Sequence, residues 1–445
     1  MRLESKIADF AREQGVELVG LAGPDRLDGP PSLDPSFVLS GAKSIVSLVV
    51  PMDVPAVEDF LSKRTHVSHN LDQTRWNQKL MRIGSRLARY IRAQGHRAAA
   101  VPSNSDYRKS PDPWSMHPSF SHRLGAVASG VAGMGWSGNV KCEEYGAATY
   151  LGTVVTDAVL ESSPRRYSPR HFADGLCRKC RRCAPSCVAQ MFSANEEEYV
   201  LINGELHPRG KRMSVDLCEI ACFGLHSLSQ DKTWSTWGVN WISDWMERPP
   251  GSLSPLAARA CLWRTGGSAG DSTARFDLIR RIGNIEYPKE MINAYLDKRP
   301  RDLPYNKRLA LLRQFAHSLG AARPGDLRTD LVLTCGNCSL ICGPDNQATA
   351  KRFSLLKKSG IVAPGPGGEP VVAKTYEEAV ALRKKHLPRI PAWRKAADGA
   401  RSAALFRKLY LGVNARSQLK GRVYALKLAN AVRKKAPGHK DHHPN

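Results

Sequence analysis

Apolar positions in the first 100 residues follow a helical spacing in some segments and a strand-like spacing in others. Residues 3–11 have helical spacing, and residues 16–21 then read as a strand. The run 45–50 is continuously apolar and ends at Pro51, which is typical of a strand buried on both faces. A helix is predicted over residues 73–95 because apolar side chains recur along one face there. These side chains are Trp76, Leu80, Ile83, Leu87 and Ile91.

The pattern continues to residue 160 with further helices and strands. Residues 98–101 and 147–156 read as strands, and 123–134 reads as a helix of small residues. A polar and aromatic loop is expected over 103–121. Strands alternating with helices over this length predict one α/β domain spanning residues 1–160.

The pattern changes after residue 160. Residues 161–222 are expected to be rich in loops, and 223–330 to form a helical insertion with tryptophans at helical spacing. A Pro/Gly-rich hinge at 364–368 is expected to introduce a basic, partly helical extension, which we assign to residues 351–445. The tryptophans are expected to be core residues, with a substrate lid as the alternative; they are Trp234, Trp237, Trp241 and Trp245.

The net charge of the chain indicates what kinds of molecule it could bind. The 445 residues include 66 Lys and Arg against 41 Asp and Glu, a net charge of +25. From Arg383 onward there are 17 basic and 2 acidic residues, so this tail contributes 17 − 2 = +15. Such an excess suits a polyanion such as RNA or an anionic membrane surface, and it is equally compatible with a solvated tail.

Location is predicted from hydropathy. The sequence has no run of 18 apolar residues and no apolar export signal at its start, so we expect no membrane span and a cytoplasmic protein. In a reducing compartment the 11 cysteines need a purpose other than disulfides.

Seven of these cysteines fall into two tight motifs, at 177–187 and 335–342. The first is C-x2-C-x2-C-x3-C and the second is C-x2-C-x3-C, which are spacings typical of proteins with two 4Fe–4S clusters. Zinc, the alternative, prefers four thiolates in two C-x2-C pairs. The first motif consists of Cys177, Cys180, Cys183 and Cys187, and the second of Cys335, Cys338 and Cys342.

Two clusters need eight ligands, so one more cysteine is required. The candidates are Cys218, Cys222, Cys261 and Cys142, of which we favour Cys218. One cluster is then assigned to Cys177, Cys180, Cys183 and Cys342. The other is assigned to Cys187, Cys218, Cys335 and Cys338. The first-motif cysteines are separated by four basic residues, at 178, 179, 181 and 182. These would raise a cluster's reduction potential and attract either an acidic electron donor, such as flavodoxin or ferredoxin, or a phosphate backbone. Exposed loop charges without such a role are an equal alternative.

A glycine-rich block precedes the first motif and carries a resemblance. Residues 132–139 read AGMGWSGN, followed by EYG at 144–146 and LGTVVTD at 151–157. This order resembles the "AGLGWxGKN … YG … LGxxxTD" block of the corrinoid-dependent family that contains epoxyqueuosine reductase and the reductive dehalogenases. Residues 16–22 and 42–46 resemble two further signatures of that family.

The resemblance implies an α+β protein. It would have an α/β nitroreductase-like domain at 1–160 that binds a cofactor, then a bacterial ferredoxin-like double-cluster module at 161–222 and 331–350, with a helical insertion and a basic helical tail. The implied cofactor is a base-off cobalamin. Glycines allow the backbone to approach such a large flat group closely. The expected cofactor-binding residues are Gly133, Gly135, Trp136 and Gly138.

The position at which the family carries its proton donor falls near Ser119 in this sequence. Serine is a poor acid, so His117 and His122 are the candidates to replace it, with Tyr107 as a further one.

The resulting hypothesis is a reductase in which two clusters relay electrons to cobalamin, most like epoxyqueuosine (tRNA) reductase. A reductive dehalogenase-like enzyme is the first alternative. A ferredoxin-like electron-transfer protein that has lost the corrinoid is the second, and an RNA-binding protein with structural clusters is the third.

Overall fold

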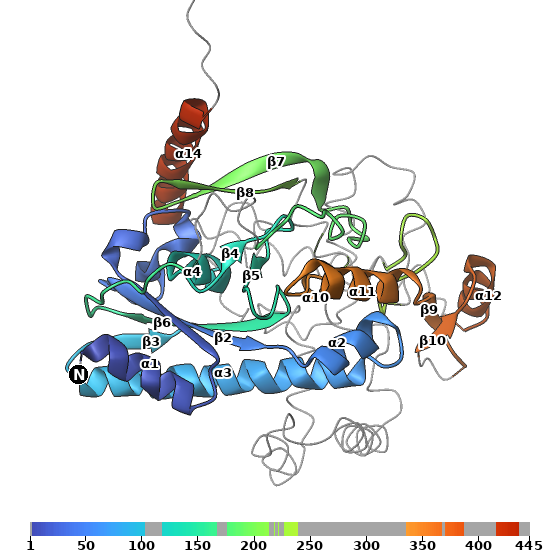
Figure 1. Ribbon diagram of the computed structural model, residues 1–445, viewed down its shortest axis with the longest axis horizontal. Coiled ribbons are helices and arrows are strands. Elements are labelled where there is room, and N and C mark those ends of the chain that lie inside the picture. Colours follow the sequence, from blue (N-terminus) through green and yellow to red (C-terminus); the bar gives the residue numbers. More distant parts are fainter. Residues whose placement is uncertain are drawn as a thin grey trace, which may run out of the picture.

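The computed structural model describes residues 2–102, 118–166, 176–212, 218, 221, 227–238, 335–366, 370–386 and 415–435. Within these residues the protein has a mixed α and β architecture built on one central sheet (Figure 1). Among the described helices, none combines the length and the apolar character needed to cross a membrane.

The central sheet has four strands in the order β1-β2-β6-β3, and every neighbouring pair is antiparallel. The strands predicted from the sequence are confirmed with small shifts at their ends. Their bounds are β1 Leu18–Ala22, β2 Ser44–Pro51, β3 Ala98–Ala100 and β6 Thr149–Thr156.

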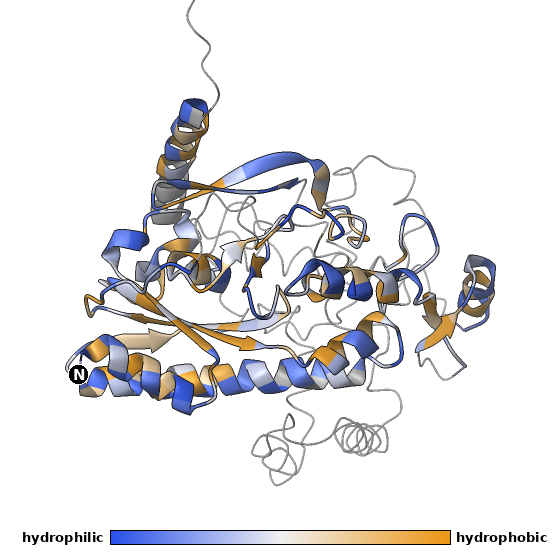
Figure 2. Ribbon diagram, viewed as in Figure 1, coloured by the Kyte–Doolittle hydropathy of each residue, from blue (hydrophilic) through white to orange (hydrophobic). Residues whose placement is uncertain are grey.

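Helices cover both faces of this sheet, which explains the unbroken apolar run of β2. Val46, Leu48 and Val50 pack against α1 and α3, whereas Ile45 and Val49 pack on the side of α4. Figure 2 shows the strands of the sheet as predominantly apolar.

The predicted helix of 123–134 is shorter, because the chain turns into a small hairpin at Gly133. The bounds are α1 Leu3–Glu13, α2 Val54–Leu61, α3 Val67–Ala93, α4 His122–Ala128, β4 Gly133–Met134 and β5 Val140–Lys141. Three short 3-10 helices follow β1, at Pro24–Arg26, Pro31–Leu33 and Pro35–Phe37.

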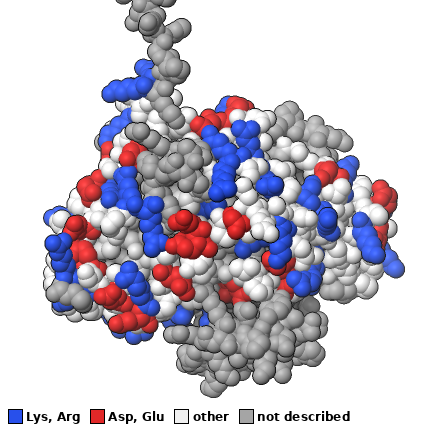
Figure 3. Space-filling view, viewed as in Figure 1, with Lys and Arg blue, Asp and Glu red and all other residues white. Residues whose placement is uncertain are grey.

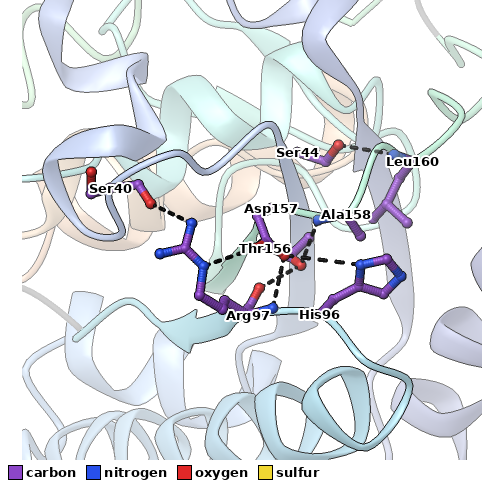
Figure 4. A network of polar contacts seen from close by, with 8 residues as sticks. All are labelled: Ser40, Ser44, His96, Arg97, Thr156, Asp157, Ala158 and Leu160. Atoms are coloured by element: carbon purple, nitrogen blue, oxygen red, sulfur yellow. Dashed lines mark hydrogen bonds and ion pairs between the residues drawn. The ribbon is translucent and has the colours of Figure 1, made fainter.

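The end of β6 is fixed by a polar network (Figure 4). The backbone and guanidinium of Arg97 donate to the carboxylate of Asp157 at 2.7 and 2.8 Å, and the Thr156 hydroxyl donates to the Arg97 carbonyl at 2.8 Å. Ser44 accepts from the backbone of Leu160 at 3.0 Å. The Thr-Asp pair at the end of β6 thus joins this strand to the residue before β3, and Ser44 joins β2 to the chain after β6.

The expectation of a loop-rich segment is wrong over residues 192–212. The chain there forms a long antiparallel hairpin of β7 Phe192–Ile202 and β8 Glu205–Arg212. Cross-strand ion pairs stabilise it, with Arg209 and Lys211 each 2.6–2.7 Å from a glutamate of β7. The helix α14 Ala415–Lys435 lies against this hairpin, and its Tyr424 hydroxyl accepts from the backbone of Leu201 at 2.9 Å.

The Pro/Gly run begins at the end of one strand of a second hairpin, whereas Gly367 and Gly368 lie outside the described residues. β9 and β10 form this hairpin and pair antiparallel. Trp234 and Trp237 are buried, which confirms the core expectation for these two. The expected helix is wrong over residues 227–238, which form turns and an isolated bridge between Leu228 and Ser235. Trp241 and Trp245 lie outside the described residues. The C-terminal elements are α10 Asn337–Leu340, α11 Asn346–Lys357, β9 Ile361–Pro364, β10 Pro370–Ala373 and α12 Tyr376–His386.

Candidate metal centre

The second cysteine motif is held against the turn that leads into β6. The backbone of Ala147 donates to the Cys342 carbonyl at 2.9 Å, and the Ser339 hydroxyl donates to the Ala147 carbonyl at 2.5 Å. Gly146 has a φ of +70°, and a Cβ there would overlap the Cys342 carbonyl and Gly343. The close approach of the two segments therefore requires a glycine at this position.

The first motif folds as a loop beside the glycine-rich block. Lys179 and Arg181 adopt positive φ angles of 48° and 57°, which curl the backbone around the cysteines. The backbone N–H of Trp136 donates to the Cys177 sulfur at 3.3 Å, and that of Met191 donates to the Cys187 sulfur at 3.4 Å. These bonds place N–H donors at two of the thiols.

Both motifs meet, together with Cys218, in one apolar environment. The buried side chains around the thiols include Trp136, Val188, Leu340 and Ile341, contributed by three separate segments. Segments around residues 136, 188 and 340, far apart in sequence, therefore form one core.

Charge interactions link the eight thiols in one network, in which the strongest charge interaction of Cys183 is with Cys338. We describe this network as two sets of four, following the ligand assignment made from the sequence. Cys342 lies close enough to Cys177 and Cys180 for their negative charges to repel, and Cys183 interacts with the same two residues and with Cys342. We call Cys177, Cys180, Cys183 and Cys342 the first thiol group.

In the second set, Cys335 interacts with Cys187, Cys338 and Cys218. Cys187 in turn interacts with Cys338 and Cys218. We call Cys187, Cys218, Cys335 and Cys338 the second thiol group. Cys183 also interacts with Cys338, so the two groups adjoin.

Burial is the main cause of the raised pKa values of these thiols. It raises the pKa of Cys342 to about 11 and of Cys187 to about 12, and neighbouring thiolates add to the shift. Within the described residues, no three side chains of His, Cys, Asp or Glu converge on the position of one metal ion. Cys180 is the exposed member of the eight.

Four residues that the sequence analysis did not assign lie at the second thiol group. The side-chain amide of Asn139 donates to the Cys338 sulfur at 3.1 Å. Arg123 and Arg212 are near enough to Cys338 for their charges to favour its thiolate, and the positive charge of Lys63 faces Cys335. Of these residues, only Asn139 was marked by the sequence as part of the site, through its position in the glycine-rich block.

The glycines of that block pack against protein. The space of a side chain at Gly133 is taken by Leu176, at Gly135 by the Asn139 backbone, and at Gly138 by the Arg212 guanidinium. Trp136 is buried, and its indole donates to the Ser193 carbonyl at 2.9 Å. These contacts account for the block without a flat cofactor, so we derive no step through a corrinoid from it.

The proton-donor candidates are only partly described. His122 is buried, with Nδ1 2.8 Å from the Thr153 hydroxyl and Nε2 3.4 Å from the Pro102 carbonyl. Burial lowers the pKa of His122 to about 4, so its ring is neutral at pH 7. This geometry favours a structural role. Ser119 is buried beside α4, and His117 and Tyr107 lie outside the described residues.

The remaining cysteines are placed as follows. Cys142 is fully buried in the core on the α4 side of the sheet, and burial raises its pKa to about 12. Cys222 and Cys261 lie outside the described residues.

No model of a known protein family matches the chain, and no curated protein matches it. Among solved structures, it is similar to the catabolic reductive dehalogenase NpRdhA in complex with 3-bromo-4-hydroxybenzoic acid. That likeness has 14% identity and a TM-score of 0.36, and it covers 56% of this chain and 33% of that one. The chain thus spans about a third of that dehalogenase.

It is also similar to two epoxyqueuosine reductase structures. The Bacillus subtilis enzyme shares 13% identity over 80% of this chain and 98% of that one, with a TM-score of 0.33. A complex with an epoxyqueuosine-modified tRNA-Tyr stem loop shares 13% identity over 96% and 99%, with a TM-score of 0.35. Likenesses this distant do not assign a function to this chain.

Proposed function

We propose that the chain is an iron–sulfur oxidoreductase in which each of the two thiol groups holds one 4Fe–4S cluster. The observation that carries this proposal is that cysteines from segments far apart in sequence come together in one apolar core, where eight thiols form a single network of charge interactions. A cubane takes each thiolate at a different iron, so its ligands need not converge on one point. When bound, such clusters supply one-electron transfer.

The protein's own residues fit this role. Apolar side chains surround the thiols and exclude water, and N–H groups at Cys177, Cys187 and Cys338 would donate to cluster-bound sulfur. The adjoining Cys183 and Cys338 connect the two groups by a short path. Cys180, exposed between Arg178 and Arg181, is the point at which a reduced acidic donor would transfer electrons.

The test is anaerobic reconstitution followed by iron and sulfide quantification. Wild-type protein should bind about eight irons, the content of two cubanes. Cys218→Ser should reduce this to about four, because one cluster loses a ligand. Cys142→Ser is the matched control and should keep about eight, because that thiol lies in a different core. Iron binding that is unaffected by Cys218→Ser would contradict the ligand assignment.

The sequence resemblance supports a second candidate, in which the same clusters reduce a base-off cobalamin that acts on epoxyqueuosine in tRNA. The glycines of the glycine-rich block pack against protein, but the block contacts both thiol groups through Trp136 and Asn139. A cobalamin bound next to the block, and not within it, would therefore lie beside both clusters. Binding of added cobalamin with a base-off visible spectrum would support this candidate. A reconstituted protein that ignores cobalamin would favour a ferredoxin-like electron-transfer protein.

The tRNA part of this candidate rests on charge. On the face shown in Figure 3, basic side chains are interspersed with acidic ones, so the basic excess forms no single patch there. In α14, Arg433 and Lys434 are exposed. Replacing both with glutamate should weaken tRNA binding and reduce its salt dependence, whereas Arg12→Glu on α1 should not. Equal binding by all three proteins would argue against a role for α14.

A further inference from the structure

Lys63 is a buried cation that the proposed function does not yet use. It follows α2, is 5% exposed, and has a φ of 61°, which is uncommon for a residue with a side chain. Its ammonium has no hydrogen-bond partner among the described residues. It lies 5.7 Å from the centre of the Trp237 ring and 6.0 Å from that of Phe60. A buried charge without a partner is costly, so a compensating group is expected.

The surroundings leave Cys335 as the compensating group. Phe60 and Trp237, the two rings beside the ammonium, belong to the same core against which Cys335 packs, which places Lys63 next to the second thiol group. A negative charge at Cys335 favours the charged form of Lys63. The nearby rings of His66 and His69 are neutral at pH 7, because burial lowers the pKa of each to about 4. The nearest carboxylate along the chain, Asp59, pairs with Arg64 at 2.6 Å.

We propose that Lys63 is the internal counter-cation of the cluster held by the second thiol group and raises the reduction potential of that cluster. The inference rests on the proposed function. A reduced cluster carries one more negative charge than an oxidised one, and a fixed positive charge in a water-excluded core stabilises that extra charge. The two aromatic rings hold the ammonium in place and shield it from water.

A cation in the same relation to the first thiol group provides a matched control. Lys141 is 7% exposed, and its charge favours the thiolates of Cys177 and Cys342. If buried lysines tune the clusters individually, removing each charge should affect one cluster and leave the other unchanged.

The experiment is an EPR-monitored redox titration of the reconstituted full chain. Lys63→Met removes the charge and keeps the length of the side chain. It should lower one midpoint potential by about 59 mV or more, a tenfold change in a one-electron equilibrium. Lys63→Arg should stay close to wild type, and Lys141→Met should lower the other midpoint potential.

Any of three results would overturn the inference. The first is that Lys63→Met has wild-type iron content and two unchanged midpoint potentials. The second is an equal shift of both midpoint potentials in Lys63→Met, and the third is a shift in Lys63→Arg as large as that in Lys63→Met. If Lys63→Met takes up no iron, Lys63→Gln provides the same comparison. A wild-type protein that takes up no iron would instead contradict the proposed function, so the two failures are distinguishable.

Discussion

The side-chain amide of Asn139 donates a hydrogen bond to the sulfur of Cys338, 3.1 Å away, across 199 positions of sequence. This contact links the glycine-rich block directly to the second thiol group. It makes Asn139 a positioning residue for whatever those thiols bind.

Replacing Asn139 with alanine should make the second cluster harder to reduce. An N–H donor to a ligating sulfur stabilises the reduced state, so its loss should lower that midpoint potential by up to about 59 mV. The same EPR signal that responds to Lys63→Met should move. Asn430→Ala, at an exposed position of α14, is the control, and an equal shift in that variant would contradict the assignment.

Gly146→Ala should release the second cysteine motif from the sheet. The new Cβ would collide with backbone atoms of Cys342 and Gly343, and the φ of +70° adds strain. Gly95→Ala is the matched control, because Gly95 has a φ of +89° and no atom lies within 4 Å of the position of its added Cβ. Both variants therefore carry backbone strain of about 1–2 kcal/mol, but only the Gly146 variant collides with other atoms. Iron content should fall in the Gly146 variant and stay normal in the Gly95 variant. Equal iron in both would show that the contact is dispensable.

Reversing charge beside Cys180 should slow electron acceptance. Arg178 and Arg181 are exposed there, whereas Lys179 is paired with Glu197 at 2.6 Å. Changing both arginines to glutamate should slow reduction by flavodoxin or ferredoxin about tenfold at low salt, and high salt should shrink the difference. Stopped-flow bleaching of the cluster absorbance measures the rate, with Arg12→Glu as the comparison. A salt-independent loss would indicate damage to the cluster rather than to docking.

Asp72 should make folding stability fall as pH rises. Burial raises its pKa to about 6, although Asp53 and Tyr150 donate hydrogen bonds to it at 3.1 and 3.0 Å. Between the unfolded value of about 3.9 and this folded value, the folded state holds the extra proton. Stability should therefore decrease by up to about 1.4 kcal/mol per pH unit over that window and level off above it.

The Asp72→Asn variant has no proton to lose at this position. As the pH rises from 4 to 7, the denaturation midpoint of this variant should increase relative to that of the wild-type protein. Parallel pH profiles of the two proteins would show that Asp72 is not the source of the dependence.

The sheet and its helices could be predicted because apolar periodicity records burial. The run of β2 and the stripe from Trp76 to Ile91 marked a strand and a helix that the structure confirms. The β7–β8 hairpin was missed because its strands are rich in charge and gain stability from cross-strand ion pairs. Its turn did carry a signal, since Asn203-Gly204 is the dipeptide that favours tight hairpins, and both residues have positive φ.

Much of the site lay beyond sequence reasoning. Spacing identified the cysteines, because a short loop must present several thiols together. Lys63, Arg123 and Arg212 reach the second thiol group through tertiary packing, and no local pattern marks such contacts. His122 attracted attention as a titratable side chain, but its burial became visible only in the fold.

Because each thiol group combines cysteines from both motifs, the order of synthesis of the chain affects when the groups can form. Each group takes members from both motifs, so neither is complete on a nascent chain until the second motif has left the ribosome. Cys187 and Cys335 are 335 − 187 = 148 positions apart, which at about 5–20 residues per second is roughly 7–30 s of synthesis. During that interval the first-motif cysteines have no partners from the second motif, and they depend on a reducing surrounding to stay as free thiols.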